Sequence, residues 1–177
     1  REHYQWNMDV VGVEHVHAEL ELLAAACDFF RRVGVTAEMV GIKVNSRAVL
    51  ERIVRQSCTE ELEPQKFMQI CVIIDKLDKI GDCAVTELLT TEQGLSEESC
   101  KLILECLRMP TIEALSEHLG DSAKEALEDV QRVFDLSKDY GFSDYLIFDA
   151  SVVRGLAYYT GIVWEAFDRK GELRAIM

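Results

Sequence analysis

Polar and apolar residues alternate strictly at the start of the chain. In the first twelve residues, REHYQWNMDVVG, apolar side chains occupy positions 4, 6, 8 and 10, and polar side chains occupy positions 3, 5, 7 and 9. Successive side chains of a strand point to opposite faces, so this pattern predicts a strand with one apolar face. In residues 15–33 the apolar residues instead recur every three or four positions, which predicts a helix that ends at Gly34.

Strand patterns return in three later segments, at residues 38–45, 144–149 and 160–167. The stretch between the first and second of these segments carries helix signals only. The chain therefore reads as an α+β fold. Its strand-bearing parts are residues 1–45 and 141–177, and a mostly helical insertion at residues 46–140 separates them.

Several helix starts within the insertion carry recognisable signals. Pro64 suits the first turn of a helix, because the missing N–H would have no partner there. Ser96 and Thr111 suit N-caps, since their hydroxyls accept from free backbone N–H groups. Ser122 followed by Glu125 resembles a capping box.

Charge and composition narrow the class of protein. The chain has 177 residues, 49% of them apolar, which is enough for a packed core. Its net charge is −13, and residues 58–140 alone hold 8 basic and 19 acidic side chains, a net of −11. Phosphate binding needs clustered cations, so a chain this acidic is a poor free-standing nucleic-acid binder. We interpret the acidic stretch as a solvated helix surface, with an acidic helical interaction module as an alternative.

The six cysteines do not form metal or disulfide motifs. None of them makes a CxxC pair, and most lie in helical apolar runs, which indicates reduced thiols in an intracellular compartment. His15 and His17 have no third ligand at metal spacing, so no metal site is expected. No apolar run reaches the roughly 18 residues of a membrane span. The chain starts at Arg1 inside a predicted strand, so we expect a fragment in which missing targeting signals mean nothing.

One candidate site lies on the polar face of the first predicted strand. Gln5 and Asp9 are four residues apart, which separates them by roughly 13 Å along a strand. An amide and a carboxylate that converge on one groove both supply acceptors for a cationic amino group. The alternative is an ordinary solvent-facing strand surface.

A second candidate is the segment VVRGLAYYTG at residues 152–161. Arg154 carries a planar guanidinium that can bind a carboxylate and a phosphate together. Tyr158 and Tyr159 offer hydroxyls on aromatic bodies, which suits a pocket for a small polar ring. The alternative is a surface turn whose tyrosines pack in the core.

Taken together, the two segments resemble the histidyl-tRNA synthetase family of class II aminoacyl-tRNA synthetases. REHYQWNMDVVG is similar to the closing half of class II motif 2, and VVRGLAYYTGIVWEAF is similar to the histidine-specific signature R-G-L-x-Y-Y-x-x-x-V-F-E. Their order, and a helical insertion between them, also match. The resemblance implies a partial class II antiparallel sheet with flanking helices, as an internal fragment of the catalytic domain.

The resemblance also implies roles for the candidate residues. Gln5 and Asp9 would hold the α-amino group of histidine, and Arg154 would bridge the histidine carboxylate and the α-phosphate of ATP. Tyr158 and Tyr159 would line the imidazole pocket. The reaction would be ATP-dependent activation of histidine to histidyl-adenylate and transfer to tRNA(His), with Mg²⁺ bound through ATP.

Further partners and limits follow from the same family. Arg1 would lie near ATP or the tRNA acceptor end. Members are homodimers, through regions outside this chain, and none of the implied partners is a membrane. The segment REHYQWNMD is similar to that of plant and protist members. The expected location is therefore the cytoplasm, the mitochondrion or the chloroplast.

The family pattern is incomplete in this chain. The first half of motif 2, motifs 1 and 3, the glycine-rich strand and the anticodon-binding domain are missing. We therefore expect the isolated 177-residue chain to be inactive and poorly soluble. A catalytically silent relative, such as a regulatory subunit of ATP phosphoribosyltransferase, is the alternative reading, although such relatives tend to lose the specificity residues that are present here.

Overall fold

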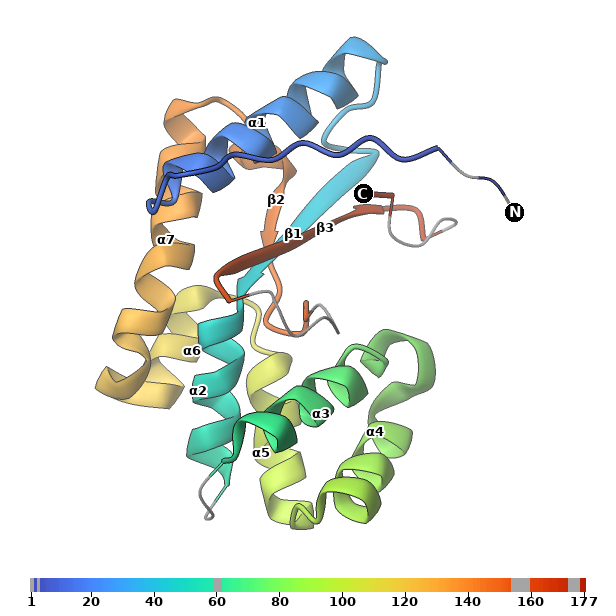
Figure 1. Cartoon of the computed structure of the whole chain (residues 1–177), viewed down its shortest axis with the longest axis vertical. Coiled ribbons are helices and arrows are strands. Elements are labelled where there is room, and N and C mark those ends of the chain that lie inside the picture. The colour runs from blue at the N-terminus through green and yellow to red at the C-terminus, as the bar shows by residue number, and fades with distance from the viewer. Residues whose placement is uncertain (1, 3, 59–61, 154–159, 172–175) are drawn as a thin grey trace.

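A computed structural model describes residues 2, 4–58, 62–153, 160–171 and 176–177. Helices dominate these residues, and three strands form one small sheet (Figure 1). No helix among the described residues is long and apolar enough to cross a membrane. The elements in chain order are α1 (His17–Arg32), β1 (Val40–Ser46), α2 (Arg47–Ser57), α3 (Pro64–Ile74), α4 (Leu77–Gln93), α5 (Glu97–Leu107), α6 (Ile112–Leu119), the 3-10 turn η1 (Gly120–Ala123), α7 (Lys124–Asp139), the 3-10 turn η2 (Ser143–Tyr145), β2 (Leu146–Phe148) and β3 (Ile162–Asp168).

The sheet is mixed, with β1 in the centre and the strand order β2-β1-β3. β1 pairs antiparallel with β3, from Val40 opposite Asp168 to Ser46 opposite Ile162. β1 pairs parallel with β2, and the six helices between them supply the crossover connection that a parallel pair needs. The predicted α+β class is confirmed, and the antiparallel arrangement holds for one of the two strand pairs.

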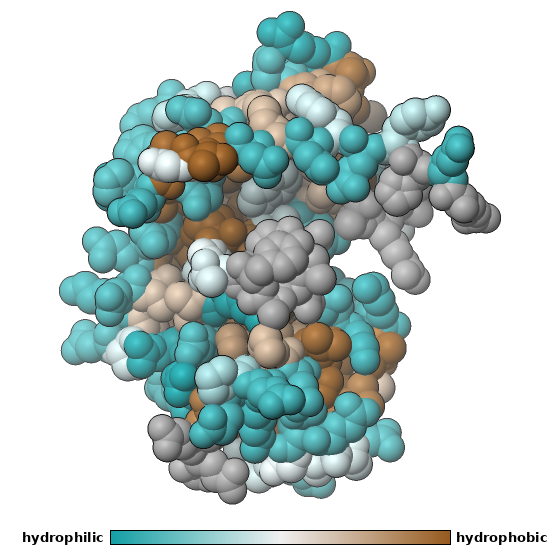
Figure 2. All heavy atoms as spheres, in the orientation of Figure 1, coloured by the Kyte–Doolittle hydropathy of each residue, from teal (hydrophilic) through white to brown (hydrophobic). Residues whose placement is uncertain are grey.

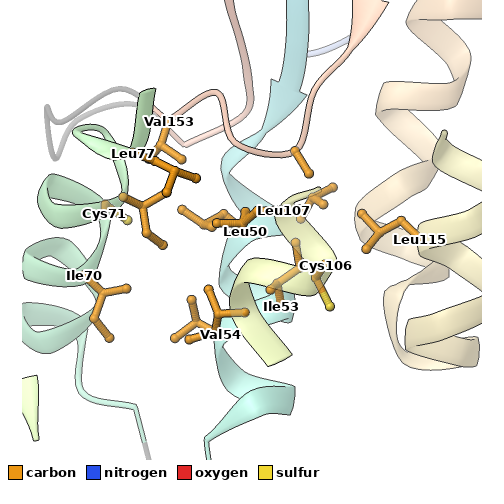
Figure 3. Close-up of a cluster of buried hydrophobic side chains, with 14 of the residues drawn as sticks. Leu50, Ile53, Val54, Ile70, Cys71, Leu77, Cys106, Leu107, Leu115 and Val153 are labelled. Carbon is orange, nitrogen blue, oxygen red and sulfur yellow. The ribbon is translucent and has the colours of Figure 1, made fainter. Parts of the chain in front are cut away.

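Two apolar cores flank the sheet and meet at α7. The first joins α1, one face of β1 and the segment before β2, and it contains Leu20, Ile42, Val44 and Tyr145. The second fills the space among α2–α6 (Figure 3). α7 contributes to both, because Val133 lies in the first core and Val130 in the second. The division into a catalytic core and an insertion at 46–140 stays a prediction.

Most local signals are confirmed. The apolar stripe of α1 is buried, and the helix ends two residues before Gly34, whose φ of +81° is the left-handed conformation that glycine adopts freely. Pro64 opens α3. The hydroxyls of Ser96 and Thr111 accept from the backbone N–H groups of Ser99 and Ala114, as N-caps do.

The predicted capping box at Ser122 is wrong. Ser122 lies inside the 3-10 turn η1, which joins α6 directly to α7. In this turn the Ser122 hydroxyl lies 3.1 Å from the Leu119 carbonyl oxygen and 3.2 Å from Oε1 of Gln56, and it donates to these acceptors. α7 begins at Lys124 with no side-chain cap.

The predicted first strand is also wrong for the residues that the structure describes. Residues 4–11 follow a course without regular secondary structure along α1 (Figure 1), and none of them is assigned to a strand. Tyr4 is 100% exposed, while Trp6 packs its ring edge-on against Phe29, at 5.9 Å between ring centroids. Alternation favours an extended backbone, but a strand also needs a partner for its ladder, and no described segment pairs with this one.

Candidate functional site

The structure describes only part of the predicted site. Gln5 and Asp9 are both exposed, on the unpaired segment before α1. Arg1, Arg154, Tyr158 and Tyr159 lie outside the described residues. The meeting of Arg154 with Gln5 and Asp9 in one hollow therefore stays a prediction.

The described residues on either side of residues 154–159, the first part of the signature, show how the fold holds the two ends of that stretch. The chain leaves the sheet after β2, and it returns at Gly161 to form β3. Val152 and Val153, just before Arg154, are buried. At the other end the Gly161 carbonyl accepts from the backbone N–H of Arg47, at 3.0 Å. Both ends are thus fixed next to the last residues of β1.

Asn45 of β1 binds the segment that leads into the signature. Its side chain is completely buried, and its amide nitrogen donates to the carbonyls of Ala150, at 2.9 Å, and Val152, at 3.2 Å. Its Oδ1 has no hydrogen-bond partner in the described part of the chain. Buried side-chain amides are kept where they satisfy buried backbone groups, and here those groups belong to the residues just before Arg154.

Lys43, two residues earlier on the same face of β1, makes the second attachment. Its ammonium lies 2.8 Å from Oδ2 of Asp149 and 3.3 Å from Oδ2 of Asp78 at the start of α4. It also lies over the ring of Phe167, at 5.3 Å from the centroid. Burial alone would lower the pKa of Lys43, but the hydrogen bond and charge of Asp149, together with Asp78, raise that pKa overall. The ammonium is therefore charged at neutral pH.

Asp149 uses both carboxylate oxygens. While Oδ2 binds Lys43, Oδ1 accepts from the backbone N–H of Ser151, at 2.9 Å, and from its hydroxyl, at 2.5 Å. This is an Asx turn, which fixes the chain direction at residues 149–151. The turn and the two Asn45 bonds together define the path of the backbone up to residue 152.

A polar cavity of about 220 Å³ lies beside this attachment. Lys43, Asp78, Arg108 and Asp149 line it, so it opens between the sheet and the helices α4 and α5. Arg108 pairs with Asp82 of α4. Each lining cation is thus held by carboxylates, which makes the cavity an ion-paired junction and a poor site for a phosphate group.

Sequence reasoning did not single out Lys43, Asn45 and Asp149, which hold the segment just before Arg154. Two signals pointed to them. Lys43 and Asn45 interrupt an otherwise apolar strand at alternate positions, and Asp149 with Ser151 has the spacing of an Asx turn. Neither signal names the partner, because Asn45 and its two acceptors lie 105 and 107 residues apart in sequence.

Other surfaces carry little chemistry. Most of the face shown in Figure 2 is hydrophilic, in agreement with the net charge of −13. Within the described ranges no group of three or more His, Cys, Asp or Glu side chains is placed to hold a metal ion. The six cysteines are thiols and not disulfides, and four of them are buried.

Comparison with known proteins identifies the family of the chain. The family model described as histidyl-tRNA synthetase matches residues 1–176. The chain is 48% identical over 177 residues to a chloroplastic/mitochondrial histidine–tRNA ligase of Arabidopsis thaliana, and 32% identical over 184 residues to a histidine–tRNA ligase of Opitutus terrae. The alignments cover 99% of this chain but 35% and 40% of those proteins, so the chain spans little more than a third of their length.

Solved structures show the same fold. A histidyl-tRNA synthetase from Nostoc superposes with a TM-score of 0.71 at 24% identity, over 84% of this chain and 36% of that one. A protein from Bacillus halodurans, described as an ATP phosphoribosyltransferase regulatory subunit/histidyl-tRNA synthetase, gives 0.72 at 18% identity, over 92% and 42%. With the two motifs in order, this fold, and a family model that matches nearly every residue, the chain belongs to the histidyl-tRNA synthetase family.

Proposed function

We propose that the polypeptide that carries this sequence is a histidine–tRNA ligase. It activates histidine with ATP to histidyl-adenylate and transfers the histidyl group to tRNA(His). The observation that carries the proposal is the 48% identity to a protein with that name, over a stretch that includes both motif-bearing segments. Isolated, this chain of about a third of that length is expected to be inactive.

The proposed roles follow from the charge changes of the reaction. A carboxylate oxygen of histidine attacks the α-phosphorus of ATP, the bond to the bridging oxygen breaks, and pyrophosphate leaves with that electron pair. Two anions must meet in this step, so Arg154 is proposed to bind both and to stabilise the charge of the transition state. Gln5 and Asp9 would accept from the α-amino group, because both side chains carry oxygen acceptors.

Tyr158 and Tyr159 are proposed to recognise the imidazole ring. A buried hydroxyl that bonds the ring is left unpaired by an apolar side chain, and this supplies discrimination of about 10⁴ or more without editing. Magnesium is proposed to enter as the counterion of the ATP phosphates. The polypeptide would act as a homodimer, and the name of the Arabidopsis relative supports a mitochondrial or chloroplast location.

A catalytically silent paralogue is the second candidate, because the Bacillus halodurans description includes a regulatory subunit. The presence of Gln5, Asp9, Arg154, Tyr158 and Tyr159 favours the enzyme, since a silent relative has no need to retain them together. The two candidates differ in one measurable reaction, the histidine-dependent exchange of pyrophosphate into ATP.

The exchange assay is to be run on the polypeptide at its full natural length. We expect exchange that depends on histidine, with Arg154→Lys lowering kcat by about a hundredfold, since lysine cannot bond both anions at once. Asp9→Asn should raise the KM for histidine. Tyr159→Phe should raise the KM for histidine, because it removes a hydroxyl proposed to bind the imidazole; Tyr140→Phe, at an exposed tyrosine at the end of α7, is its matched control and should change nothing. Histidine binding without any exchange would favour the silent paralogue.

A further inference from the structure

One cation connects three separate parts of the described fold. Lys43 sits in the central strand β1, Asp149 lies in the segment that enters the signature, and Asp78 lies at the start of α4. The side chain of Lys43 is 24% exposed and that of Asp149 20%, while that of Asp78 is 63% exposed. The Lys43–Asp149 pair is therefore the sheltered, stronger contact, and Asp78 is the weaker one.

We propose that Lys43 is a positioning residue for histidine activation. It acts on the signature through Asp149, and Asp78 of α4 influences the same segment through Lys43. This inference rests on the proposed function, because it concerns the placement of Arg154. Lys43 itself touches no predicted substrate group, so it is not assigned a catalytic role.

Asp149 lies close to Arg154 along the chain. Asp149 is five residues before Arg154, and the backbone between them is fixed at Ala150 and Val152 by Asn45 and at Ser151 by the Asx turn. Removal of the ammonium leaves a mostly buried carboxylate without its cation, held among the described residues by the two bonds from Ser151. A displacement of about 1 Å at a transition-state group lowers a rate by up to about a hundredfold.

Gly81 has a φ of +80° and breaks helix α4 between Asp78 and Asp82. On the two sides of this break, Asp78 binds Lys43 and Asp82 binds Arg108, so both acids attach the break to neighbouring elements. A movement of the first turn of α4 thus displaces Asp78 relative to Lys43. The effect is transmitted to Asp149 through the Lys43 side chain alone.

The test uses the polypeptide at full natural length and the exchange assay. Lys43→Met should lower kcat by about tenfold, and Asp149→Asn should do the same, with the double variant no worse than either single one. Asp78→Asn should lower kcat by about twofold, the size of an exposed ion pair, and should have no effect once Lys43→Met is present. The matched controls are Lys79→Met and Asp75→Asn, an exposed pair at the α3–α4 junction.

A second measurement does not depend on activity. The amide of Val152 donates to the Asp149 carbonyl, and that of Ser151 to its carboxylate, so both should be protected from hydrogen exchange. Lys43→Met should speed exchange at these two amides by tenfold or more, whereas Lys79→Met should not. Asp149→Asn, which keeps an oxygen acceptor for Ser151, serves if Lys43→Met does not fold.

Each outcome decides something. Unchanged kcat and unchanged amide exchange in Lys43→Met or Asp149→Asn would overturn the inference. If Asp78→Asn lowers kcat equally in the presence and absence of Lys43, α4 does not act through Lys43 and that part of the inference is wrong. If the unsubstituted polypeptide shows no histidine-dependent exchange, the proposed function fails, and the amide measurement still judges whether Lys43 fixes the segment.

Discussion

Replacement of Asn45 should destabilise the fold, and aspartate, although closer to asparagine in shape, should be more harmful than alanine. The side chain is fully buried in β1 and donates to two carbonyls of the segment before the signature. Alanine removes both donors and leaves a small cavity. Aspartate keeps the size of the side chain but brings carboxylate oxygens against the same two carbonyl oxygens. We therefore expect Asn45→Asp to be the more harmful change.

The magnitude follows from the number of groups left unpaired. Each lost bond that leaves a buried carbonyl without a partner costs about 1–3 kcal/mol. Alanine also removes Oδ1, which has no partner in the described chain, and this returns about 1–3 kcal/mol. The net cost of Asn45→Ala is thus about 2 kcal/mol, while an unpaired buried charge in Asn45→Asp costs about 3–5 kcal/mol.

Urea unfolding of the full-length polypeptide, at neutral pH, measures both variants. Asn7→Ala is the control, because Asn7 lies exposed on the segment before α1, and its free energy of unfolding should stay within about 0.5 kcal/mol of the unsubstituted protein. If Asn45→Ala were as stable as that control, or if Asn45→Asp were no worse than Asn45→Ala, the assignment of Asn45 as the anchor of residues 150–152 would be refuted.

Three other predictions concern the same region and the thiols. Gly41→Ala should cost about 1–3 kcal/mol, because a β-carbon would lie 2.8 Å from the Phe167 ring, whereas Gly161→Ala, with open space around it, should be neutral in the same unfolding experiment. The pKa of Lys43 is raised by Asp149 and Asp78, so its contribution to stability is complete below pH 10.5 and is lost as the pH rises through the folded-state pKa; Lys43→Met should remove that loss from a pH series of unfolding midpoints. Alkylation of the native protein at pH 8 should modify exposed Cys83 before Cys27, Cys71, Cys100 and Cys106, as mass spectrometry of peptides would show, because burial raises the pKa of these four thiols; their modification at the rate of Cys83 would contradict the packing. The pKa values are about 12 for Cys27 and about 11 for Cys71 and Cys106.

The sequence predicted elements well wherever their cause is local. The stripe on α1, the proline that opens α3 and the caps at Ser96 and Thr111 each depend on residues within one or two turns. Two predictions failed for the same reason as each other. A strand at residues 1–12 needs a partner strand from another part of the chain. At Ser122, the 3-10 turn that joins α6 to α7 takes the place of the capping box.

The same distinction between local signals and long-range contacts applies to the candidate site. Gln5, Asp9 and Arg154 were named from motifs that are compact in sequence, but whether they meet is a property of the whole fold and stays a prediction. Lys43 and Asn45 were read only as parts of a strand, because Asp149 and the two carbonyls that Asn45 binds lie more than 100 residues later. Strand periodicity shows that a polar side chain shares a face, and it does not show what covers that face.

The two faces of β1 explain how one short strand serves both stability and the site. Ile42 and Val44 point into the core with α1, while Lys43 and Asn45, at the alternate positions, bind residues 149–152. A cavity made at Val44 should therefore lower the free energy of unfolding by about 1–3 kcal/mol and leave kcat unchanged, whereas Lys43→Met should lower kcat by about tenfold. Equal kinetic damage from Val44→Ala and Lys43→Met would show that the strand acts on the signature as a rigid unit, and that the polar face has no separate role.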